Sequence, residues 1–379
     1  MLAALSKPYR GFRTGLNEDQ VLQAASFVKT HLLDLGYEYI IIPLGWYSAK
    51  PASPFEPVFT DDYSRLIPSP VRFPSSKSSK GLGPLASKLH SMGLKLGLEI
   101  MHGIARQCVY KGSAIMESES TASDIARAFP ACSWNADCYG VDPHRSGAFE
   151  YYQSLIDLYE SWGVDLIRVE DVLEGSLDEA ALLVDSIEQG QTDMVLSLGS
   201  SDAFLELADE LVDNNGAFSI AHRSCSSYSD IVHALDKASS WAAFRRPGCL
   251  LDCGFIKPGM DPVELQTAMR FWSLMGSPMI IDADPSALDK ATLKILSDRF
   301  LLELHKSGQC PRQTCDTGKL RIWMAELNGS SITALFNTSE EAISLKYSGK
   351  AYDWQQNLLS SDPVVQLARH QSAIYEARS

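Results

Sequence analysis

The sequence carries little positive charge for its length. Its 379 residues include 33 lysines and arginines against 47 aspartates and glutamates, which gives a formal net charge of −14 at pH 7. An acidic surface repels phosphate backbones and anionic lipid headgroups, so we expect neither nucleic acid nor a membrane surface as a partner. No apolar run approaches the roughly 20 residues that a membrane-spanning helix needs.

An export signal and metal-ligand spacing of the cysteines are also missing. The N-terminus, MLAALSKPYRGF, has no basic segment ahead of its short apolar start. Among the eight cysteines, Cys249 with Cys253 and Cys310 with Cys315 are the close pairs, and neither has C-x-x-C spacing. We therefore expect free thiols, a cytoplasmic location, no metal and no other cofactor. A small-molecule substrate is the expected partner, and a homodimer stays open.

A unit of helix, glycine and short apolar strand recurs along the chain, most clearly in residues 151–172. Apolar residues at spacings of three and four predict one buried helical face. Gly163 then ends the helix, and the β-prone run 164–169 predicts a strand buried on both faces. That strand runs into two adjacent carboxylates, Glu170 and Asp171. The C-terminal end of a buried parallel strand is where α/β folds keep their active sites.

Eight such strands, each followed by a helix, predict an α/β fold, a (β/α)8 TIM barrel over residues 1–315. The predicted strands are 9–13, 37–42, 94–101, 164–169, 194–198, 217–222, 249–253 and 278–284. The predicted helices are 17–34, 83–92, 151–162, 178–189, 203–214, 228–242, 262–275 and 289–306. After the barrel, apolar residues alternate with period two, which predicts a small antiparallel β-domain over residues 316–379. Two long inserts, 47–82 and 102–147, follow strand ends and are expected to wall a pocket.

Polar and aromatic residues cluster where the predicted barrel strands end, so we expect them to line one cavity. Side chains alternate along a strand, so Arg168 shares the face of Glu170, while Asp171 points toward the barrel wall. The predicted catalytic residues are Glu170, Asp171, Arg168 and His102. The predicted substrate-binding residues are Trp46, Tyr47, Glu99, Arg106, His222, Arg223, Ser227, Tyr228 and Asp252.

Several longer segments carry a family signature. In chain order they are DLGYEYIII with GWY, RLIPSPVRFPSS with KGLGPLASKLHSMGLKLGLEIMHGIARQ, SWNADCYGVD, YYQSLIDLYESWGVDLIRVEDV, SSWAAFRRPG and FWSLMGSPMII. Together they resemble glycoside hydrolase family 27, the α-galactosidase family, over nearly the whole chain. The resemblance implies the same barrel followed by the same small β-domain.

At the functional positions, the resemblance implies several replacements. Glu170 stands at the position of the family's nucleophilic aspartate, and Arg168 stands at that of a lysine. Pro43 and Leu44 occupy the positions of acidic residues that hold sugar hydroxyls. Ser227 occupies the position of the aspartate that serves as acid and base.

Three functions are compatible with these residues. A retaining glycosidase needs two carboxyls about 5–5.5 Å apart, one of them a proton donor, and a serine hydroxyl is too weak an acid for that role. We therefore favour a repurposed enzyme, not a competent α-galactosidase, that acts on a less polar molecule by acid–base catalysis. A cyclisation, isomerisation or elimination in metabolite biosynthesis would fit. The alternatives are an active α-glycosidase with altered sugar specificity, Glu170 as nucleophile and Asp230 as displaced acid, or a non-catalytic protein that binds a sugar or a protein.

Overall fold

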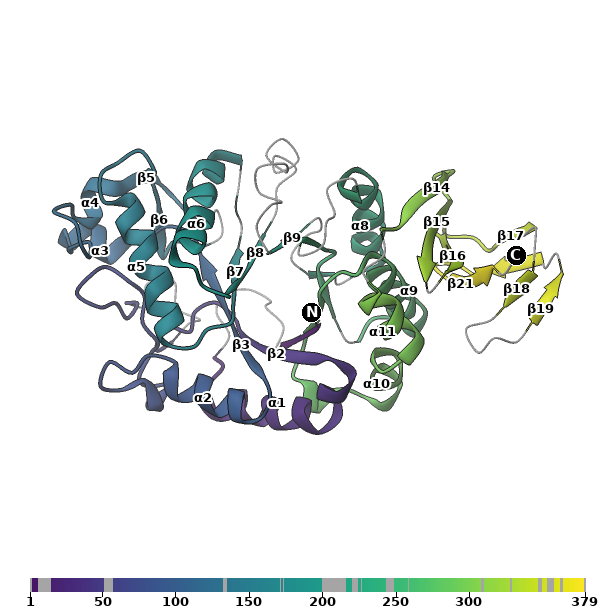
Figure 1. Ribbon diagram of the computed structural model, residues 1–379, viewed down its shortest axis with the longest axis horizontal. Helices are drawn as coiled ribbons and strands as arrows, with labels where there is room; N and C mark the ends of the chain where they lie inside the picture. Colours follow the sequence, from purple (N-terminus) through teal and green to yellow (C-terminus); the bar gives the residue numbers. More distant parts are fainter. Residues whose placement is uncertain are drawn as a thin grey trace. The chain divides into compact units, whose positions relative to one another are not determined.

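The first half of the chain builds a parallel sheet whose strands pair in chain order (Figure 1). The strands are β1 (Leu2–Leu5), β2 (Tyr37–Ile42), β3 (Lys95–Met101), β7 (Leu166–Glu170), β8 (Val195–Leu198) and β9 (Gly216–Ser219). Each is parallel to its neighbour. The first described strand, β1, lies earlier in the chain than the predicted 9–13, because the apolar run at the N-terminus pairs with β2.

The computed structural model describes most of the chain. The described residues are 2–5, 15–50, 57–131, 135–170, 172, 174–199, 216–219, 224–225, 227–242, 249–257, 259–307, 310–327, 329–346, 350–352, 358–361 and 364–377. They divide into two compact units. The first unit holds residues 1–218 and 282–286, and the second holds 219–281 and 287–379. The predicted strand 9–13 and the predicted helix 203–214 lie outside the described residues.

Helices follow the strands of the first unit as the apolar periodicity predicts. They are α1 (Glu18–His31), α2 (Gly83–Ser91), α5 (Ala148–Ser161) and α6 (Leu177–Gly190). Asn17 and Gln20 form a capping box at the start of α1, each side chain accepting from the other's backbone N–H at 3.0 and 3.2 Å. Gly163 has φ +76°, a conformation that favours glycine, and it turns the chain from α5 toward β7.

The two predicted inserts interrupt this pattern after β2 and after β3. The first carries one short helix, η2 (Pro74–Ser76). The second carries α3 (Arg106–Lys111), α4 (Ala122–Ile125) and the strands β4 (Ile104–Ala105), β5 (Ala126–Pro130) and β6 (Cys138–Val141). These strands pair antiparallel in the order β4-β6-β5. The second insert is therefore a small folded layer of its own.

The second unit continues with strands and helices before it changes to an antiparallel sheet. Its elements are β10 (Ser224–Cys225), α8 (Tyr228–Trp241), β11 (Cys249–Asp252), β12 (Phe255–Ile256), α9 (Pro262–Met275), β13 (Met279–Asp282), α10 (Lys290–Leu296) and α11 (Arg299–Lys306). The short helix η5 (Pro285–Ala287) lies mostly in the first unit. β10, β12 and β13 pair in parallel. The predicted helix 289–306 is two helices, because the Asp298 carboxylate caps a new start by accepting from the Leu301 N–H at 3.2 Å.

The C-terminal strands form the antiparallel sheet that the period-two pattern predicts. The strands are β14 (Arg312–Asp316), β15 (Leu320–Leu327), β16 (Ser330–Asn337), β18 (Lys350–Tyr352), β19 (Leu358–Ser361) and β21 (Ser372–Ala377), in the order β14-β15-β16-β21-β18-β19. A separate pair joins β17 (Ile343–Lys346) to β20 (Val364–Leu367). The predicted fold class, a parallel α/β sheet followed by a small antiparallel β-domain, is therefore confirmed.

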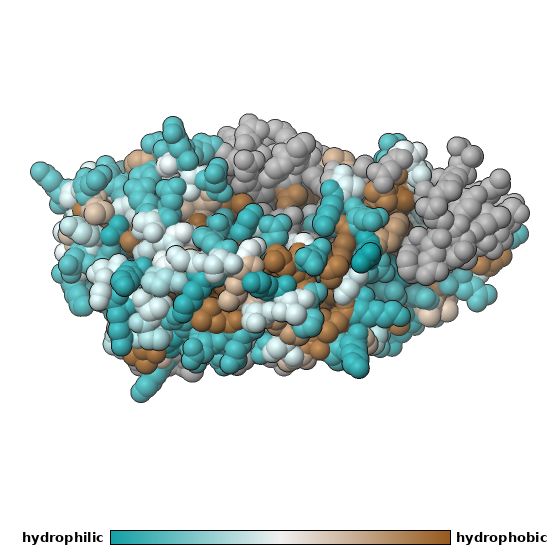
Figure 2. Space-filling model, turned by 60° about the horizontal axis from the view of Figure 1, so that its bottom comes forward, coloured by the Kyte–Doolittle hydropathy of each residue, from teal (hydrophilic) through white to brown (hydrophobic). Residues whose placement is uncertain are grey.

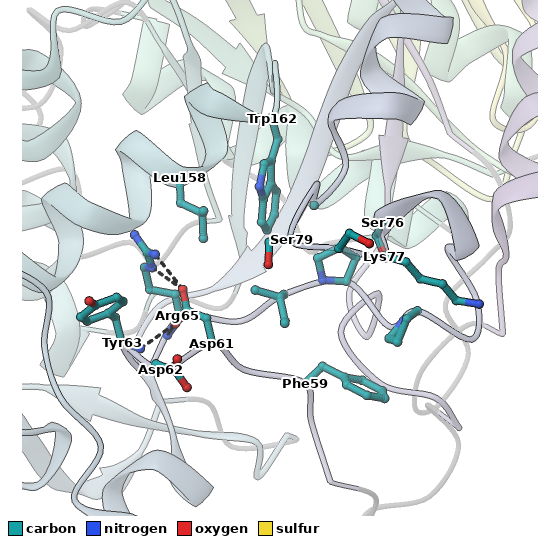
Figure 3. Close-up of a pocket in the computed structure, with 15 residues that line it drawn as sticks. Phe59, Asp61, Asp62, Tyr63, Arg65, Ser76, Lys77, Ser79, Leu158 and Trp162 are labelled. Carbon is teal, nitrogen blue, oxygen red and sulfur yellow. Dashed lines mark hydrogen bonds and ion pairs between the residues drawn. The ribbon is translucent and has the colours of Figure 1, made fainter.

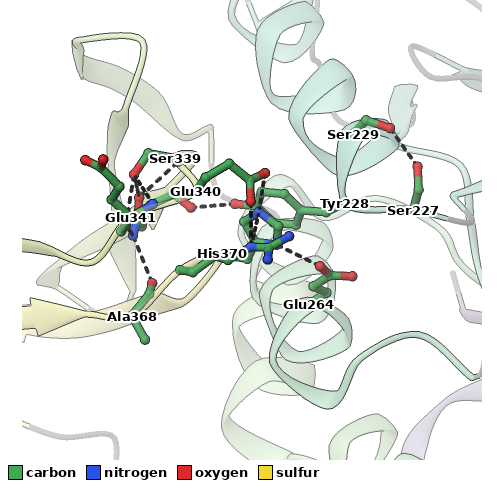
Figure 4. Close-up of polar contacts among 11 residues, drawn as sticks. Ser227, Tyr228, Ser229, Glu264, Ser339, Glu340, Glu341, Ala368 and His370 are labelled. Atoms are coloured by element: carbon green, nitrogen blue, oxygen red, sulfur yellow. Dashed lines mark hydrogen bonds and ion pairs between the residues drawn. The ribbon is translucent and has the colours of Figure 1, made fainter.

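Within the second unit, a polar cluster joins the C-terminal sheet to α8 and α9 (Figure 4). The Tyr228 hydroxyl donates to the carbonyl of Asn337 at 2.6 Å, and its ring stacks on His370 with centroids 3.7 Å apart. His370 contacts the carboxylates of Glu264 at 2.7 Å and Glu340 at 3.1 Å. Tyr228, a predicted substrate-binding residue, therefore has a structural partner on the C-terminal sheet.

The protein's surface is mainly hydrophilic on the face shown in Figure 2, with apolar side chains exposed between the polar ones. The longest of the helices given above have 14 residues. Among the described residues, no helix has both the length and the apolar character to cross a membrane.

Candidate active site

Three buried polar side chains form a row across the first sheet. Glu99 on β3 pairs with Arg168 on β7, which pairs with Ser197 on β8, so all three share one face. They are 3%, 1% and 3% exposed. A guanidinium N–H of Arg168 donates to the Ser197 hydroxyl at 3.2 Å. Two buried charged residues in this row point to function, because buried charges are costly to fold.

Glu170 completes this row at the end of β7. The Nε of Arg168 donates to the Glu170 carboxylate at 3.1 Å, and Glu170 is 2% exposed. Alternation along the strand therefore places the two side chains together, as predicted. A charge-assisted hydrogen bond from a fixed donor holds one carboxylate oxygen and orients the other. Asp171 lies outside the described residues.

The chain after β2 is anchored to Glu99. The carboxylate of Glu99 accepts from the Leu44 N–H at 3.1 Å, and its backbone carbonyl accepts from the Trp46 indole N–H at 2.9 Å. Trp46 is fully buried, with its ring edge-on to Tyr47 at 5.2 Å between centroids. The structure thus brings together four of the predicted residues: Glu99 and Arg168 across the sheet, and Trp46 and Tyr47 beside them.

Arg72, which the sequence did not single out, clamps the same loop. Its guanidinium donates to the carbonyls of Gly45 at 2.6 Å, Ser48 at 3.1 Å and Leu16 at 2.8 Å. Burial lowers the pKa of Arg72 to about 10, which still leaves it charged at neutral pH. The clamped carbonyls flank Trp46 and Tyr47. The signal was present in the RFPSS segment, where this arginine is the only charged residue.

We expect Arg72→Met to reduce kcat/KM by roughly 100-fold, because a shift of about 1 Å in a positioned side chain can cost that much. Arg72→Lys should give an intermediate loss, since an ammonium cannot bridge several carbonyls as the planar fork does. Turnover of the substrate that the protein accepts measures the effect, with Arg145→Met, whose side chain is 66% exposed, as the matched control. Equal turnover of the Met variants at 72 and 145 would contradict a positioning role.

The second insert meets the β2 loop through Asp137, which was also not predicted. The Tyr47 hydroxyl donates to the Asp137 carboxylate at 3.1 Å, and the backbone N–H of Arg106 donates to the backbone carbonyl of Asp137 at 2.9 Å. The guanidinium of Arg106 lies 4.5 Å above the Tyr139 ring. Asp137 belongs to the SWNADCYGVD segment of the family signature. It is a further buried carboxylate beside the predicted Trp46 and Tyr47.

His102 directly follows β3, which ends at Met101, and its ring lies beside helix α6. Its Nδ1 is 3.1 Å from the carboxylate of Glu179 on α6. That carboxylate also accepts from the Tyr152 hydroxyl at 2.5 Å and from the Val141 N–H at 3.0 Å. Burial and the neighbouring Glu179 charge raise the pKa of Tyr152 well above its usual range, so it stays a donor. The structure therefore groups His102 with helix residues, and its catalytic role stays a prediction.

The remaining predicted residues belong to the second unit. Ser227 and Asp230 form the capping box of α8, in which one Asp230 oxygen accepts from the Ser227 N–H and hydroxyl, both at 2.9 Å. Asp252 is fully buried and accepts from the Gly254 N–H at 2.8 Å. His222 and Arg223 lie outside the described residues. Asp230, the predicted displaced acid, thus has a structural use at the start of a helix.

Comparisons with known proteins agree on one family. A solved variant of the family 27 β-L-arabinopyranosidase of Geobacillus stearothermophilus, in complex with arabinose, has a TM-score of 0.91 and 28% identity, covering 100% of this chain and 97% of that one. Alpha-galactosidase 2 of Arabidopsis thaliana is 20% identical over 345 residues, 86% of this chain and 72% of that protein. The alpha-N-acetylgalactosaminidase of Gallus gallus is 21% identical over 290 residues, 72% of this chain and 59% of that protein. No family model matches the chain.

The chain is a homologue of glycoside hydrolase family 27. Its fold is accordingly a (β/α)8 barrel with a C-terminal β-domain, as in the family 27 structures. The favoured interpretation of a repurposed enzyme for a less polar molecule is wrong. The proteins that this chain resembles over most of its length are glycoside hydrolases. That interpretation rested on missing carboxyls. It gave too little weight to the carboxylate that stands at the end of β7, where a family 27 nucleophile is expected.

Proposed function

We propose that the protein is an O-glycosyl hydrolase of pyranosides with the galacto ring configuration, with β-L-arabinopyranosides as its first candidate substrates. The likeness to the Geobacillus stearothermophilus enzyme over the whole chain is the observation that carries this proposal. A β-L-arabinopyranosyl group has the ring configuration of an α-D-galactosyl group and lacks only its hydroxymethyl group. One pocket shape would therefore suit both the arabinopyranosyl and the galactosyl group.

In the proposed reaction, Glu170 acts as the nucleophile. Its carboxylate attacks the anomeric carbon, a carbon–oxygen bond forms to Glu170, and the bond to the leaving group breaks. Water then hydrolyses the glycosyl ester and releases the sugar. Arg168 orients the carboxylate through the 3.1 Å contact, and the anchored loop with Trp46 and Tyr47 walls the sugar site. Each step transfers one glycosyl group and needs no oxidant or cofactor.

Proton donation to the departing oxygen is the demanding step. Ser227 cannot protonate it, because a hydroxyl is far too weak an acid at neutral pH. Asp230, the predicted displaced acid, has one oxygen in the α8 cap, so the proton donor stays unassigned. Aryl glycosides with acidic leaving groups depend little on a donor and are therefore the substrates to try first.

A panel of 4-nitrophenyl glycosides tests the substrate class. We expect kcat/KM for the β-L-arabinopyranoside to exceed that for the α-D-galactopyranoside by about 10-fold to 100-fold, the range that one carbon substituent contributes in a pocket. The physical reason is the apolar Leu44, two residues after the end of β2, at a position where the resemblance implies sugar-binding acids in the family. The β-D-galactopyranoside, with the opposite anomeric configuration, is the negative control. The proposal would be contradicted if the protein cleaved neither the α-D-galactopyranoside nor the β-L-arabinopyranoside.

A further inference from the structure

A pocket of about 520 Å³ lies between residues 59–81 of the first insert and helix α5 (Figure 3). Its volume falls within the 300–1,000 Å³ typical of small-molecule sites. None of the candidate active-site residues lines it. We propose that this pocket binds a neutral sugar at a second site, separate from the proposed catalytic centre.

The charges of the pocket favour an uncharged ligand. Asp61 and Asp62 supply two negative charges and Arg65 and Lys77 supply two positive ones, so the formal charge of the lining is zero. A phosphate or another strongly charged ligand would meet as much repulsion as attraction. Hydroxyl groups both donate and accept, so a polyol can use carboxylates and cations together. This set of groups therefore suits the rim of a sugar ring.

Two of these charged groups are available to a ligand. Asp62 and Lys77 are exposed side chains, and neither makes an ion pair or a side-chain hydrogen bond with the described residues. Figure 3 shows them on different sides of the pocket, with Ser79 and Trp162 between them. A molecule with hydroxyls around its edge can reach both sides, whereas a single-headed polar group engages only one.

The other part of the lining is apolar. Leu158 comes from α5, Trp162 directly follows that helix, and Phe59, Pro68 and Pro70 come from the insert. A pyranose ring has C–H bonds on one face, which pack on aromatic and aliphatic surface while its hydroxyls point to the rim. The pocket has an apolar floor and a polar rim whose formal charges cancel. These two parts complement the C–H face and the hydroxyl groups of a pyranose ring.

The walls are fixed before any ligand arrives. The guanidinium of Arg65 holds the Asp61 carboxylate at 2.7 Å and donates to the Ser154 carbonyl on α5 at 3.1 Å. Gly81 has φ +52°, and a Cβ there would lie 2.0 Å from the Trp162 indole, so a residue without a side chain is required. Preorganised walls reduce the entropic cost of ordering the site when a ligand binds.

Trp162 supplies a signal for binding. Its indole is 5% exposed, lines the pocket and contacts Trp46 edge to face, with centroids 6.2 Å apart. A sugar packed beside this ring changes its surroundings and hence the tryptophan fluorescence. The signal is separate from turnover. Because Trp46 walls the proposed catalytic site, the change is assigned to the pocket only where it is lost on removing pocket residues.

The experiment uses the full chain and two monosaccharides, L-arabinose and D-galactose, titrated by calorimetry and tryptophan fluorescence. The double variant Asp62→Ala with Lys77→Ala removes the rim groups and keeps the net charge. The matched control is Lys80→Ala with Glu160→Ala, which removes the same charges from exposed residues outside the lining. We expect the double variant to bind at least one sugar more than tenfold more weakly at one site, while the control binds normally and both keep kcat/KM within twofold.

Two results would overturn the proposal. One is a double variant that binds both sugars as tightly as the control does. The other is the absence of any sugar binding to the unmodified protein beyond a single site that depends on Glu170. Failure of the proposed hydrolase is read separately, as no turnover of any chromogenic glycoside. Sugar binding that still depends on Asp62 and Lys77 would then support the pocket even in a protein without that activity.

Discussion

Replacing Glu170 by glutamine is expected to reduce kcat/KM on the best glycoside by about 100-fold to 10,000-fold. Glutamine keeps the shape of the side chain, but its amide cannot form the glycosyl ester. Because Glu170 and Arg168 are both buried and 3.1 Å apart, the change also removes the carboxylate charge that the Arg168 Nε contacts. We expect that to lower the free energy of unfolding by about 3 kcal/mol. Activity and stability therefore have to be measured together.

A second variant separates the two effects. Arg168→Met combined with Glu170→Gln removes both charges, so it should regain much of the stability that the single change loses. If Glu170 is only half of a structural ion pair, activity should return with stability. If it is the nucleophile, the double variant should be stable and inactive. Asp171→Asn, one residue further along the chain, is the neighbour control and should have a milder effect on turnover.

Covalent labelling gives a readout that a structural role cannot imitate. A 2-deoxy-2-fluoro glycoside with an acidic leaving group slows the second step, so the glycosyl ester accumulates. We expect mass spectrometry to find the label on the peptide that contains Glu170, and to find none in the Glu170→Gln variant. A label on another carboxylate, with Glu170→Gln still active, would move the chemistry elsewhere.

Much of this site follows from local rules of sequence. Strand β2 occupies the predicted residues 37–42, because an apolar, β-branched run follows a helix end and a glycine. The pairing of Arg168 with Glu170 follows from the two-residue alternation of a strand, and both side chains are buried together. The end of a buried strand is therefore the part of a barrel that a sequence describes best.

The supporting residues could not be derived in the same way. Arg72 donates to backbone carbonyls 24 to 56 residues away in sequence. Every residue has such a carbonyl, so the sequence does not mark which ones accept a hydrogen bond. Asp137 and Glu179 meet partners 90 and 27 residues away, so no periodicity connects them. The free thiols, the cytoplasmic location and a homodimer stay predictions. Local patterns predict elements, whereas the contacts between inserts depend on how the whole first unit folds.

Glu179 is expected to carry the largest single contribution to stability among these supporting residues. Its carboxylate is fully buried and holds together three parts of the first unit: Tyr152 on α5, Val141 on β6 and His102 after β3. Glu179→Leu removes the partner of all three at once. Breaking a buried network of this kind costs about 3–5 kcal/mol, so we expect a fall in melting temperature on the order of 10 °C. Glu188→Leu, an exposed change on the same helix, is the matched control and should leave the melting temperature nearly unchanged.

A compensating variant then decides what His102 does. Combining Glu179→Leu with His102→Phe replaces both members of the pair by apolar groups, which should recover part of the lost stability because no polar ring is left unpaired. If His102 is a structural partner, turnover should recover together with the melting temperature. If His102 is catalytic, the double variant should be stable but should turn over glycosides as poorly as His102→Phe alone. A melting temperature of Glu179→Leu equal to that of Glu188→Leu would show instead that this buried carboxylate holds nothing together.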